Sequence, residues 1–80
     1  MASSLHSYKH DVFRKLLIEA RKNADLTQVE VARRLNVHQS FVSKYEIGER
    51  RLDFTEFIDI SEVLNIDLLE FLKKYKKIAT

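Results

Sequence analysis

The fold is decided by residues 27–46, which read TQVEVARRLNVHQSFVSKYE. Thr27 and Glu30 form a capping-box pattern, in which each side chain bonds the main-chain amide of the other residue, and this pattern predicts the start of a helix. The apolar positions of that helix end at Leu35. Asn36 follows, a residue that tolerates the left-handed conformation at which helices end. The apolar pattern resumes almost at once, so the stretch predicts two short helices joined by a tight turn, the geometry of a helix-turn-helix.

The pattern of residue types and spacings within this unit is more specific than a single short motif. Counted from Gln28, the small residue Ala32 stands four positions on, where the second helix of the unit would cross closely. Asn36 occupies the turn position that needs a positive φ. The small core between the two helices would be formed by Val31, Leu35, Val37, Val42 and Tyr45. Residues of the right type at such fixed spacing strongly favour a helix-turn-helix.

The rest of the chain predicts further helices. Asp53 and Asp67 each stand three residues before a glutamate, a pattern that marks a helix start. Gly48 is expected to end the second helix of the unit. Apolar side chains at the spacing of a helix face indicate helices over about residues 11–23, 53–64 and 67–75.

Composition narrows the fold class. The chain has 80 residues, with one glycine and no proline. A β-sandwich or barrel needs many tight turns, which use those two residue types, so an all-α fold is favoured. A chain of this length forms one domain. We expect a compact five-helix domain over residues 9–76, a helix-turn-helix unit at about 27–46, and a flexible N-terminal arm over residues 1–8.

Missing residue types and motifs exclude several function classes. The chain has no cysteine, which excludes disulfides and thiolate metal sites and favours a cytoplasmic protein. His6 and His10 lack a third ligand nearby, so we expect no metal and no cofactor. No catalytic motif or phosphate-binding loop is present, so an enzyme is not expected. No apolar run approaches the roughly 18 residues that span a membrane, so no membrane partner is expected.

The charge is unevenly distributed along the chain. The net charge is +2. Residues 9–51 hold ten basic and six acidic residues, whereas residues 52–72 hold six acidic residues and no basic one. This distribution indicates a polyanionic partner for the first part of the chain only.

A known family shares these motifs. Residues 26–35 (LTQVEVARRL), residues 37–46 (VHQSFVSKYE) and Gly48 resemble the lambda-repressor-like, Cro/XRE-type helix-turn-helix family. The resemblance extends over about residues 12–75. It implies a five-helix DNA-binding domain. Members are usually dimeric transcription regulators, among them phage repressors, restriction-modification controller proteins and antitoxins.

The chain departs from the family pattern at three positions. Asn36 stands where the family often has glycine, and Asp53 stands where it often has proline. His38 is a weaker helix cap than Ser, Thr or Asn. None of these departures threatens the fold, although the last leaves the entry into the following helix open.

The base-contacting residues can be predicted from the helix that follows His38. A recognition helix presents its first solvent-facing residues to base edges in the major groove. Glutamine can bond adenine at N6 and N7, lysine can reach guanine, and serine can bond either base. The resemblance implies the same positions. We expect base contacts from Gln39, Ser40 and Lys44, with His38 and Ser43 shared between bases and phosphate; the alternative is an ordinary solvated helix face.

Phosphate contacts are expected at two places. Thr27 and Gln28 lie at a helix start, where backbone amides and the helix dipole favour an anion. Arg50 and Arg51 lie in the loop after the recognition helix, although exposed arginines are common. The resemblance also implies a structural ion pair between Arg21 and Glu46, against the alternative of two surface charges.

The last two predicted helices are apolar over more than one face, which is typical of helices that are buried beyond a single stripe. The excess apolar surface favours a two-fold dimer interface. The alternative is that both faces are used within the monomer. The residues expected in the interface are Phe54, Phe57, Ile60, Leu68 and Phe71.

The sequence therefore predicts a sequence-specific DNA-binding transcription regulator of the repressor or controller type. It would act as a homodimer on double-stranded DNA at a near-palindromic operator, with recognition helices about 34 Å apart. The alternative is a protein-interaction module, such as an antitoxin or a partner-regulated domain, that binds a protein partner through residues 53–64 and 67–75.

Overall fold

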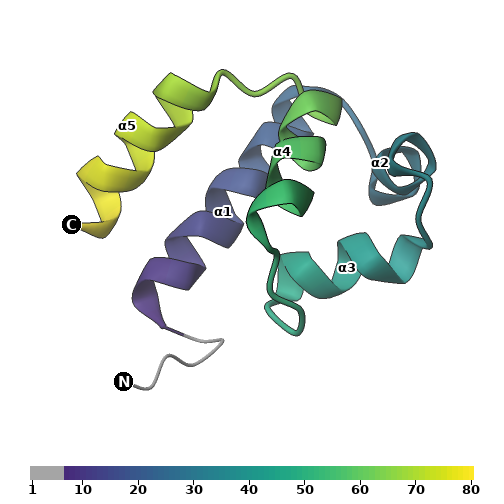
Figure 1. Cartoon of the computed structure of the whole chain (residues 1–80), viewed down its shortest axis with the longest axis horizontal. Coiled ribbons are helices and arrows are strands. Elements are labelled where there is room, and N and C mark those ends of the chain that lie inside the picture. The colour runs from purple at the N-terminus through teal and green to yellow at the C-terminus, as the bar shows by residue number, and fades with distance from the viewer. Residues whose placement is uncertain (1–6) are drawn as a thin grey trace.

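The computed structural model describes residues 7–80, which form five α-helices and no strand (Figure 1). This confirms the predicted all-α, five-helix fold. Residues 1–6 of the predicted arm lie outside the described residues. The first helix begins earlier than the expected Asp11, and the last helix ends later than the expected Tyr75. The helices are α1 (Tyr8–Asn23), α2 (Gln28–Leu35), α3 (Gln39–Ile47), α4 (Phe54–Val63) and α5 (Leu68–Ala79).

Each helix starts at a polar side chain that accepts a main-chain amide, because the first amides of a helix have no partner within it. Full capping boxes start α2 at Thr27 and α4 at Asp53. Asp67 caps α5 through the amide of Glu70. Ser7, predicted to lie in the arm, caps α1 and explains its early start.

Left-handed residues end the helices sharply, which allows five of them in a short chain. Asn36 has φ 60° and closes α2, as the sequence predicts. Gly48 has φ 90° and closes α3. Asp25 and Asn65, in the turns after α1 and α4, also have positive φ. Asparagine and aspartate are the non-glycine residues that adopt this conformation most readily.

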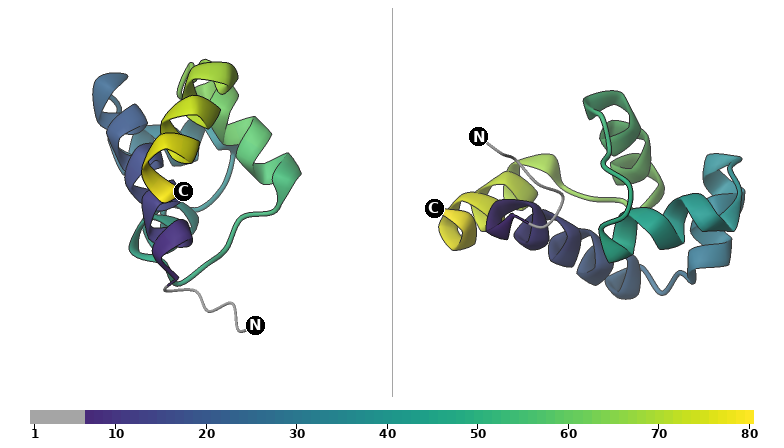
Figure 2. Two further views of the ribbon diagram at one scale, coloured as in Figure 1. Left: turned by 90° about the vertical axis from the view of Figure 1, so that its left-hand side faces the viewer. Right: turned by 90° about the horizontal axis from the view of Figure 1, so that it is seen from below.

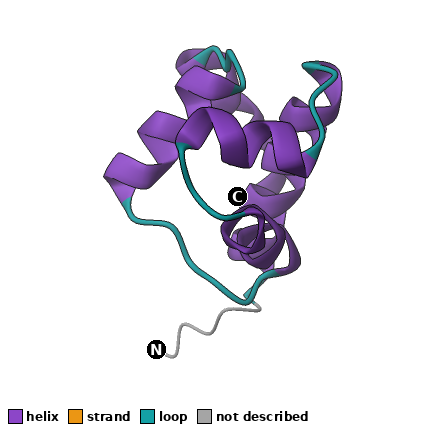
Figure 3. Cartoon of the chain, turned by 90° about the vertical axis from the view of Figure 1, so that its right-hand side faces the viewer, coloured by secondary structure: helices purple, strands orange, loops and turns teal. Residues whose placement is uncertain are grey.

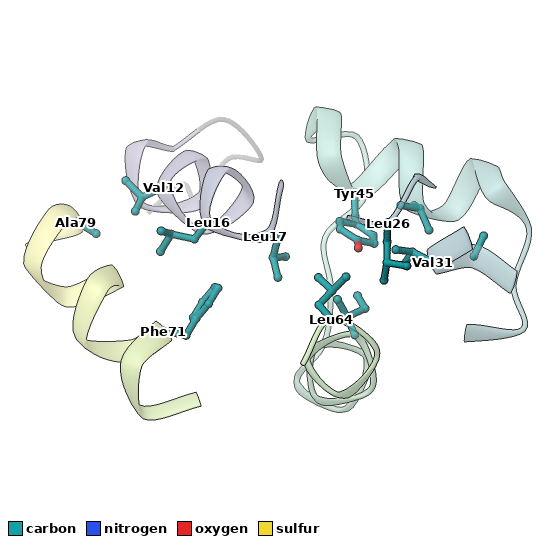
Figure 4. Close-up of a cluster of buried hydrophobic side chains, with 12 residues drawn as sticks. Val12, Leu16, Leu17, Leu26, Val31, Tyr45, Leu64, Phe71 and Ala79 are labelled. Carbon is teal, nitrogen blue, oxygen red and sulfur yellow. The ribbon is translucent and has the colours of Figure 1, made fainter. Parts of the chain in front are cut away.

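The buried side chains form two groups along α1 (Figure 4). In one group, Val12 and Leu16 of α1 face Phe71 and Ala79 of α5. The other group lies among α2, α3 and α4, and it includes the fully buried Val31, Val42, Tyr45 and Ile60. Leu17 lies between the two groups. The core therefore ties the helix-turn-helix and α5 to different parts of one helix.

The arrangement leaves α2 and α3 at one end of the molecule. In Figure 1 and the right view of Figure 2, α5 lies beside α1 at one end, and α2 and α3 lie at the other. Figure 3 looks onto that second end, where short loops join the helices. None of the helices over residues 7–80 has the length and apolar character needed to cross a bilayer.

Candidate nucleic-acid interface

The predicted base-contacting residues lie together at the start of α3. His38, Gln39, Ser40 and Lys44 are exposed, and Ser43 is half-buried. The opposite face of the helix carries its buried residues, Val42, Tyr45 and Glu46. The structure thus brings the predicted residues to one polar surface at the outer end of the molecule.

His38 is an effective cap for α3 despite its weak intrinsic preference. Its Nδ1 accepts the amide of Ser40 at 3.1 Å and also lies 3.0 Å from the hydroxyl oxygen of Ser40. A nitrogen that accepts the amide carries no proton, so the proton of the neutral ring is on Nε2. The cap leaves Nε2 as the ring donor for a ligand, and it settles where α3 begins.

A chain of hydrogen bonds leads from Gln39 into the protein. Its Nε2 donates to Oε1 of Gln28 at 3.4 Å, and Nε2 of Gln28 donates to Oε1 of Glu46 at 2.8 Å. Gln28, predicted as a phosphate contact, therefore uses its amide to connect α2 with α3. The orientation of the Gln39 amide follows from this chain, since its nitrogen faces Gln28 and its oxygen remains to accept another bond.

This series of hydrogen bonds ends at an ion pair between the half-buried Arg21 and the buried Glu46. Nε of Arg21 donates to Oε2 of Glu46 at 2.7 Å, and a terminal nitrogen donates to Oε1 at 3.1 Å. The same arginine donates to the carbonyl of Leu26 at 3.0 Å. The hydrogen bond to Glu46 raises the pKa of Arg21 above its ordinary value. These bonds attach the recognition helix to α1, as the resemblance implies.

The start of α2 carries a carboxylate within its capping box. The hydroxyl of Thr27 accepts the amide of Glu30 at 3.1 Å, and Oε1 of Glu30 accepts the amide of Thr27 at 2.8 Å. That backbone hydrogen bond lowers the pKa of the Glu30 carboxyl. Thr27 is exposed. Its hydroxyl proton is therefore the group that it can offer a phosphate.

Arg50 has protein partners that the sequence analysis missed. Its two terminal nitrogens donate to the carboxylate of Glu56 at 3.0 and 2.9 Å, and its guanidinium lies 4.6 Å from the centre of the Phe41 ring. The hydrogen bond to Glu56 raises the pKa of Arg50. Arg50 thus fastens the loop between α3 and α4. The side chain of Arg51, in the same loop, is exposed. The sequence feature that could have indicated this pair of Arg50 and Glu56 is the position of Glu56 in the capping box of α4, only six residues after Arg50.

Arg14 is a second residue that the sequence analysis missed. It donates to the main-chain carbonyl of Glu46 and to the carboxylate of Asp11. The available signal was its spacing, because Arg14 precedes Arg21 by seven residues and so lies on the same face of α1.

The residues predicted for a dimer interface separate into two groups. Ile60 and Phe71 lie in the core of the monomer, and Phe57 packs between Phe13 and Phe71 with ring centres 5.3 Å from each. Phe54 and Leu68 remain exposed. Ile60 and Phe71 are therefore core residues, because the inner faces of α4 and α5 meet the rest of the chain.

Metal-binding residues do not assemble in the described chain. Across residues 7–80, no three histidine, cysteine, aspartate or glutamate side chains cluster as metal ligands would. His10 lies on α1 and packs against Phe13, with ring centres 6.2 Å apart. His6 lies outside the described residues.

The fold and the surface of α3 define a helix-turn-helix protein. The sequence profile of the family described as "Helix-turn-helix" matches residues 17–71, and the chain belongs to this family. The match, together with the relatives below, confirms the resemblance to the Cro/XRE type. This is a family of DNA-binding regulators and not of enzymes.

Two relatives support the assignment. The solved structure of an XRE-family like protein from Pseudomonas syringae pv. tomato str. DC3000 superimposes with a TM-score of 0.84 at 41% identity, over 94% of each chain. The "Uncharacterized HTH-type transcriptional regulator YqaE" of Bacillus subtilis (strain 168) is 34% identical over 62 residues, which is 78% of this chain and 53% of the relative. The chain thus spans about half the length of that regulator.

Proposed function

We propose that the chain is a sequence-specific DNA-binding transcription regulator that reads base edges with the start of α3. The observation that carries the proposal is the exposed polar surface of Gln39, Ser40 and Lys44 on a helix whose other end is fixed by a partly buried ion pair. A reading surface must be both accessible to bases and rigidly held, because direct readout depends on hydrogen-bond geometry.

Gln39 is proposed to select adenine. Adenine presents an acceptor at N7 and a donor at N6 in the major groove, and a glutamine amide can bond both. The bond to Gln28 orients the Gln39 amide, whose nitrogen keeps a second proton for N7 and whose oxygen accepts from N6. Replacing Gln39 with alanine should therefore relax the preference at one base pair and leave the others unchanged.

Phosphate contacts are proposed for Thr27 and Arg51. Both side chains are exposed, one at the start of α2 and the other in the loop after α3. Arg50 is a weaker candidate than the sequence indicates, because a phosphate would have to compete with Glu56 for its guanidinium. Phosphate contacts position the protein on the duplex and carry no base information.

We also propose that the protein binds as a homodimer on a near-palindromic site. The supporting observation is that large apolar side chains are exposed on α5, at Leu69 and Leu72, and at the start of α4, at Phe54; Phe54 is 73% and Leu69 70% exposed. Leu69 and Leu72 are three residues apart on α5 and therefore lie on one face of the helix, and neighbouring exposed apolar side chains of this kind mark interaction sites. Leu69 and Leu72 replace the buried Ile60 and Phe71 as the interface candidates.

The same exposed surface favours one other function, a module that binds a protein partner through α4 and α5. In that case DNA binding would be secondary or absent. Two-fold symmetry in a selected DNA site is what separates the two functions, since it requires two copies of this chain on the DNA.

The experiment is selection from a randomised duplex library, followed by titration of the selected site at several salt concentrations. We expect a two-fold consensus sequence. Lys44→Ala should lower the preference for this sequence over random DNA about tenfold. Lys77→Ala removes the same charge from an exposed position on α5 and should leave that preference unchanged. Weak, steeply salt-dependent binding without a consensus would contradict the regulator and favour the partner-binding module.

A further inference from the structure

Two arginines of α1 hold the same residue of α3 at two different points. Arg21 bonds the carboxylate of Glu46, and Arg14 bonds its main-chain carbonyl at 2.5 Å. Seven residues separate the two arginines, which is close to two turns at about 3.6 residues per turn. Both guanidinium groups therefore extend from one face of α1 to the C-terminal end of the recognition helix.

Arg14 also packs closely against the residue that ends α3. A Cβ atom at Gly48 would lie 3.1 Å from Nε of Arg14 and 3.3 Å from its guanidinium carbon. Gly48 in addition has φ 90°, a conformation that side-chain-bearing residues rarely adopt. The guanidinium thus lies against the bare backbone at the helix end, where a Cβ atom would crowd it.

The remaining bonds of Arg14 keep the side chain at this position. One terminal nitrogen donates to Asp11 at 2.8 Å, and the side chain is 18% exposed. Its Nε is buried without a hydrogen-bond partner. A cation next to the last carbonyls of a helix is favourable, because these carbonyls carry the negative end of the helix dipole.

We propose that Arg14 is a positioning residue that fixes the direction in which α3 leaves the domain. The proposal rests on the proposed function, since direction matters only if α3 reads DNA. The buried side chains of Val42 and Tyr45 and the carboxylate of Glu46 all hold α3 through side chains, which leave the end of the helix some freedom to pivot. The bond from Arg14 to the main chain removes this pivot, and so it sets where Gln39 and Lys44 meet the bases.

This role differs from direct contact with DNA. The two terminal nitrogens of Arg14 are engaged by Glu46 and Asp11, so a phosphate would have to displace a protein partner. A residue that acts through helix direction changes discrimination between sites. A phosphate contact instead changes affinity for every sequence and lowers the salt slope by about 1.

The test measures the ratio of affinities for the selected operator and for a random duplex of equal length. It compares Arg14→Met with Lys15→Met, which removes the same charge from the exposed neighbouring position on α1. We expect Arg14→Met to lower the ratio about tenfold with an unchanged salt slope, and Lys15→Met to leave the ratio at the wild-type value.

Two results with Arg14→Met would overturn the proposal. A folded Arg14→Met protein with the wild-type ratio would show that Arg14 serves stability alone, and an equal loss on both duplexes with a smaller salt slope would show a phosphate contact. If Arg14→Met does not fold, the same ratio is measured with Arg14→Lys. Lysine keeps the charge but has one ammonium group in place of the two terminal nitrogens of the guanidinium. We expect it to lower the ratio about threefold, and an unchanged ratio would overturn the proposal. Failure of the wild-type protein to select an operator would instead reject the proposed function.

Discussion

Glu46 and Phe71 are buried to similar extents, at 5% and 8% exposed, yet different forces hold them. Glu46, at the end of α3, is surrounded by the donors of Arg14, Arg21 and Gln28. Phe71, on α5, packs against Phe57 and lies edge-on to the ring of a third phenylalanine on α1. The stability of the polar region around Glu46 depends on the direction of its hydrogen bonds and on charge. The stability of the apolar region around Phe71 depends on the buried area and on how well the side chains fit together.

The difference shows how the molecule divides its tasks. Hydrogen bonds and ion pairs fix orientation, because their strength depends steeply on geometry. Apolar burial is non-directional and contributes in proportion to the area removed from water. The helix proposed to read DNA is therefore oriented by directional bonds in addition to the packing of Val42 and Tyr45, whereas α5 is held against α1 mainly by packing.

The largest effect is expected from Glu46→Ala, which would leave the half-buried Arg21 without its charged partner. Removing one partner of a buried pair should lower the free energy of unfolding by about 4 kcal/mol. Urea denaturation followed by circular dichroism measures it. Glu49→Ala, an exposed glutamate just beyond α3, is the control and should change little. A loss below about 1 kcal/mol would mean that the polar region is no more than a surface ion pair.

A smaller effect is expected from Phe71→Ala. The cavity left among the rings should lower the free energy of unfolding by about 3 kcal/mol. Leu69→Ala on the same helix is the matched control, because its side chain is 70% exposed and its loss should change stability by less than about 0.5 kcal/mol. Equal losses in the two variants would contradict the assignment of Phe71 to the core and Leu69 to the surface.

Acid should weaken the helix starts and leave the aromatic packing unaffected. Backbone hydrogen bonds at the caps lower the pKa of Glu30 and Asp53, and the bond from Arg50 lowers the pKa of Glu56. Groups with a depressed folded-state pKa bind protons more readily when the chain is unfolded. Their stabilisation is therefore fully present above the unfolded-state pKa, which is 4.5 for the glutamates and 3.8 for the aspartate, and it is lost as pH falls through the lower folded-state pKa.

Unfolding in urea between about pH 7 and pH 3 measures this decline. Asp53→Asn should make the decline shallower, because asparagine still caps a helix and does not titrate. Stability that rises as the pH falls below 4.5 would contradict the sign of these shifts.

The smallest effect is expected from Glu56→Gln, which removes one charge from the exposed pair with Arg50. An ion pair at the surface contributes about 0.5 kcal/mol. Thermal unfolding without chemical denaturant, at low and at high salt, measures this contribution. The difference in melting temperature between the variant and the wild type should shrink as the salt concentration rises. A decrease in the free energy of unfolding as large as that of Glu46→Ala would contradict the difference expected between the Arg21–Glu46 pair and the more exposed Arg50–Glu56 pair.

The helix-turn-helix could be predicted closely because its signals are local. Thr27 with Glu30 marks a helix start, and Asn36 marks a helix end, whatever the surroundings. The pair of Arg21 and Glu46 came from the family resemblance and is present in the structure. The start of α1 was missed because Ser7 is a single polar residue before an irregular apolar pattern.

The apolar end could not be divided into core and surface from the sequence. Ile60, Phe71 and Leu69 are similar in character, and which of them is buried depends on the rotation of α4 and α5 against α1. The partners of Arg50 and Arg14 were missed for a related reason. A long side chain can reach many atoms, and the three-dimensional arrangement selects among them.

Tyr8 and Ile78 bring the two ends of the described chain together, since the tyrosine hydroxyl donates to the carbonyl of Ile78 at 3.2 Å. A short linker from Thr80 to Ser7 could therefore join them, with new termini opened between α4 and α5. In such a circular permutant, α5 would directly precede α1. Their packing, now the longest-range in the chain, would become local, and the lower contact order should let this protein fold faster with the same set of helices.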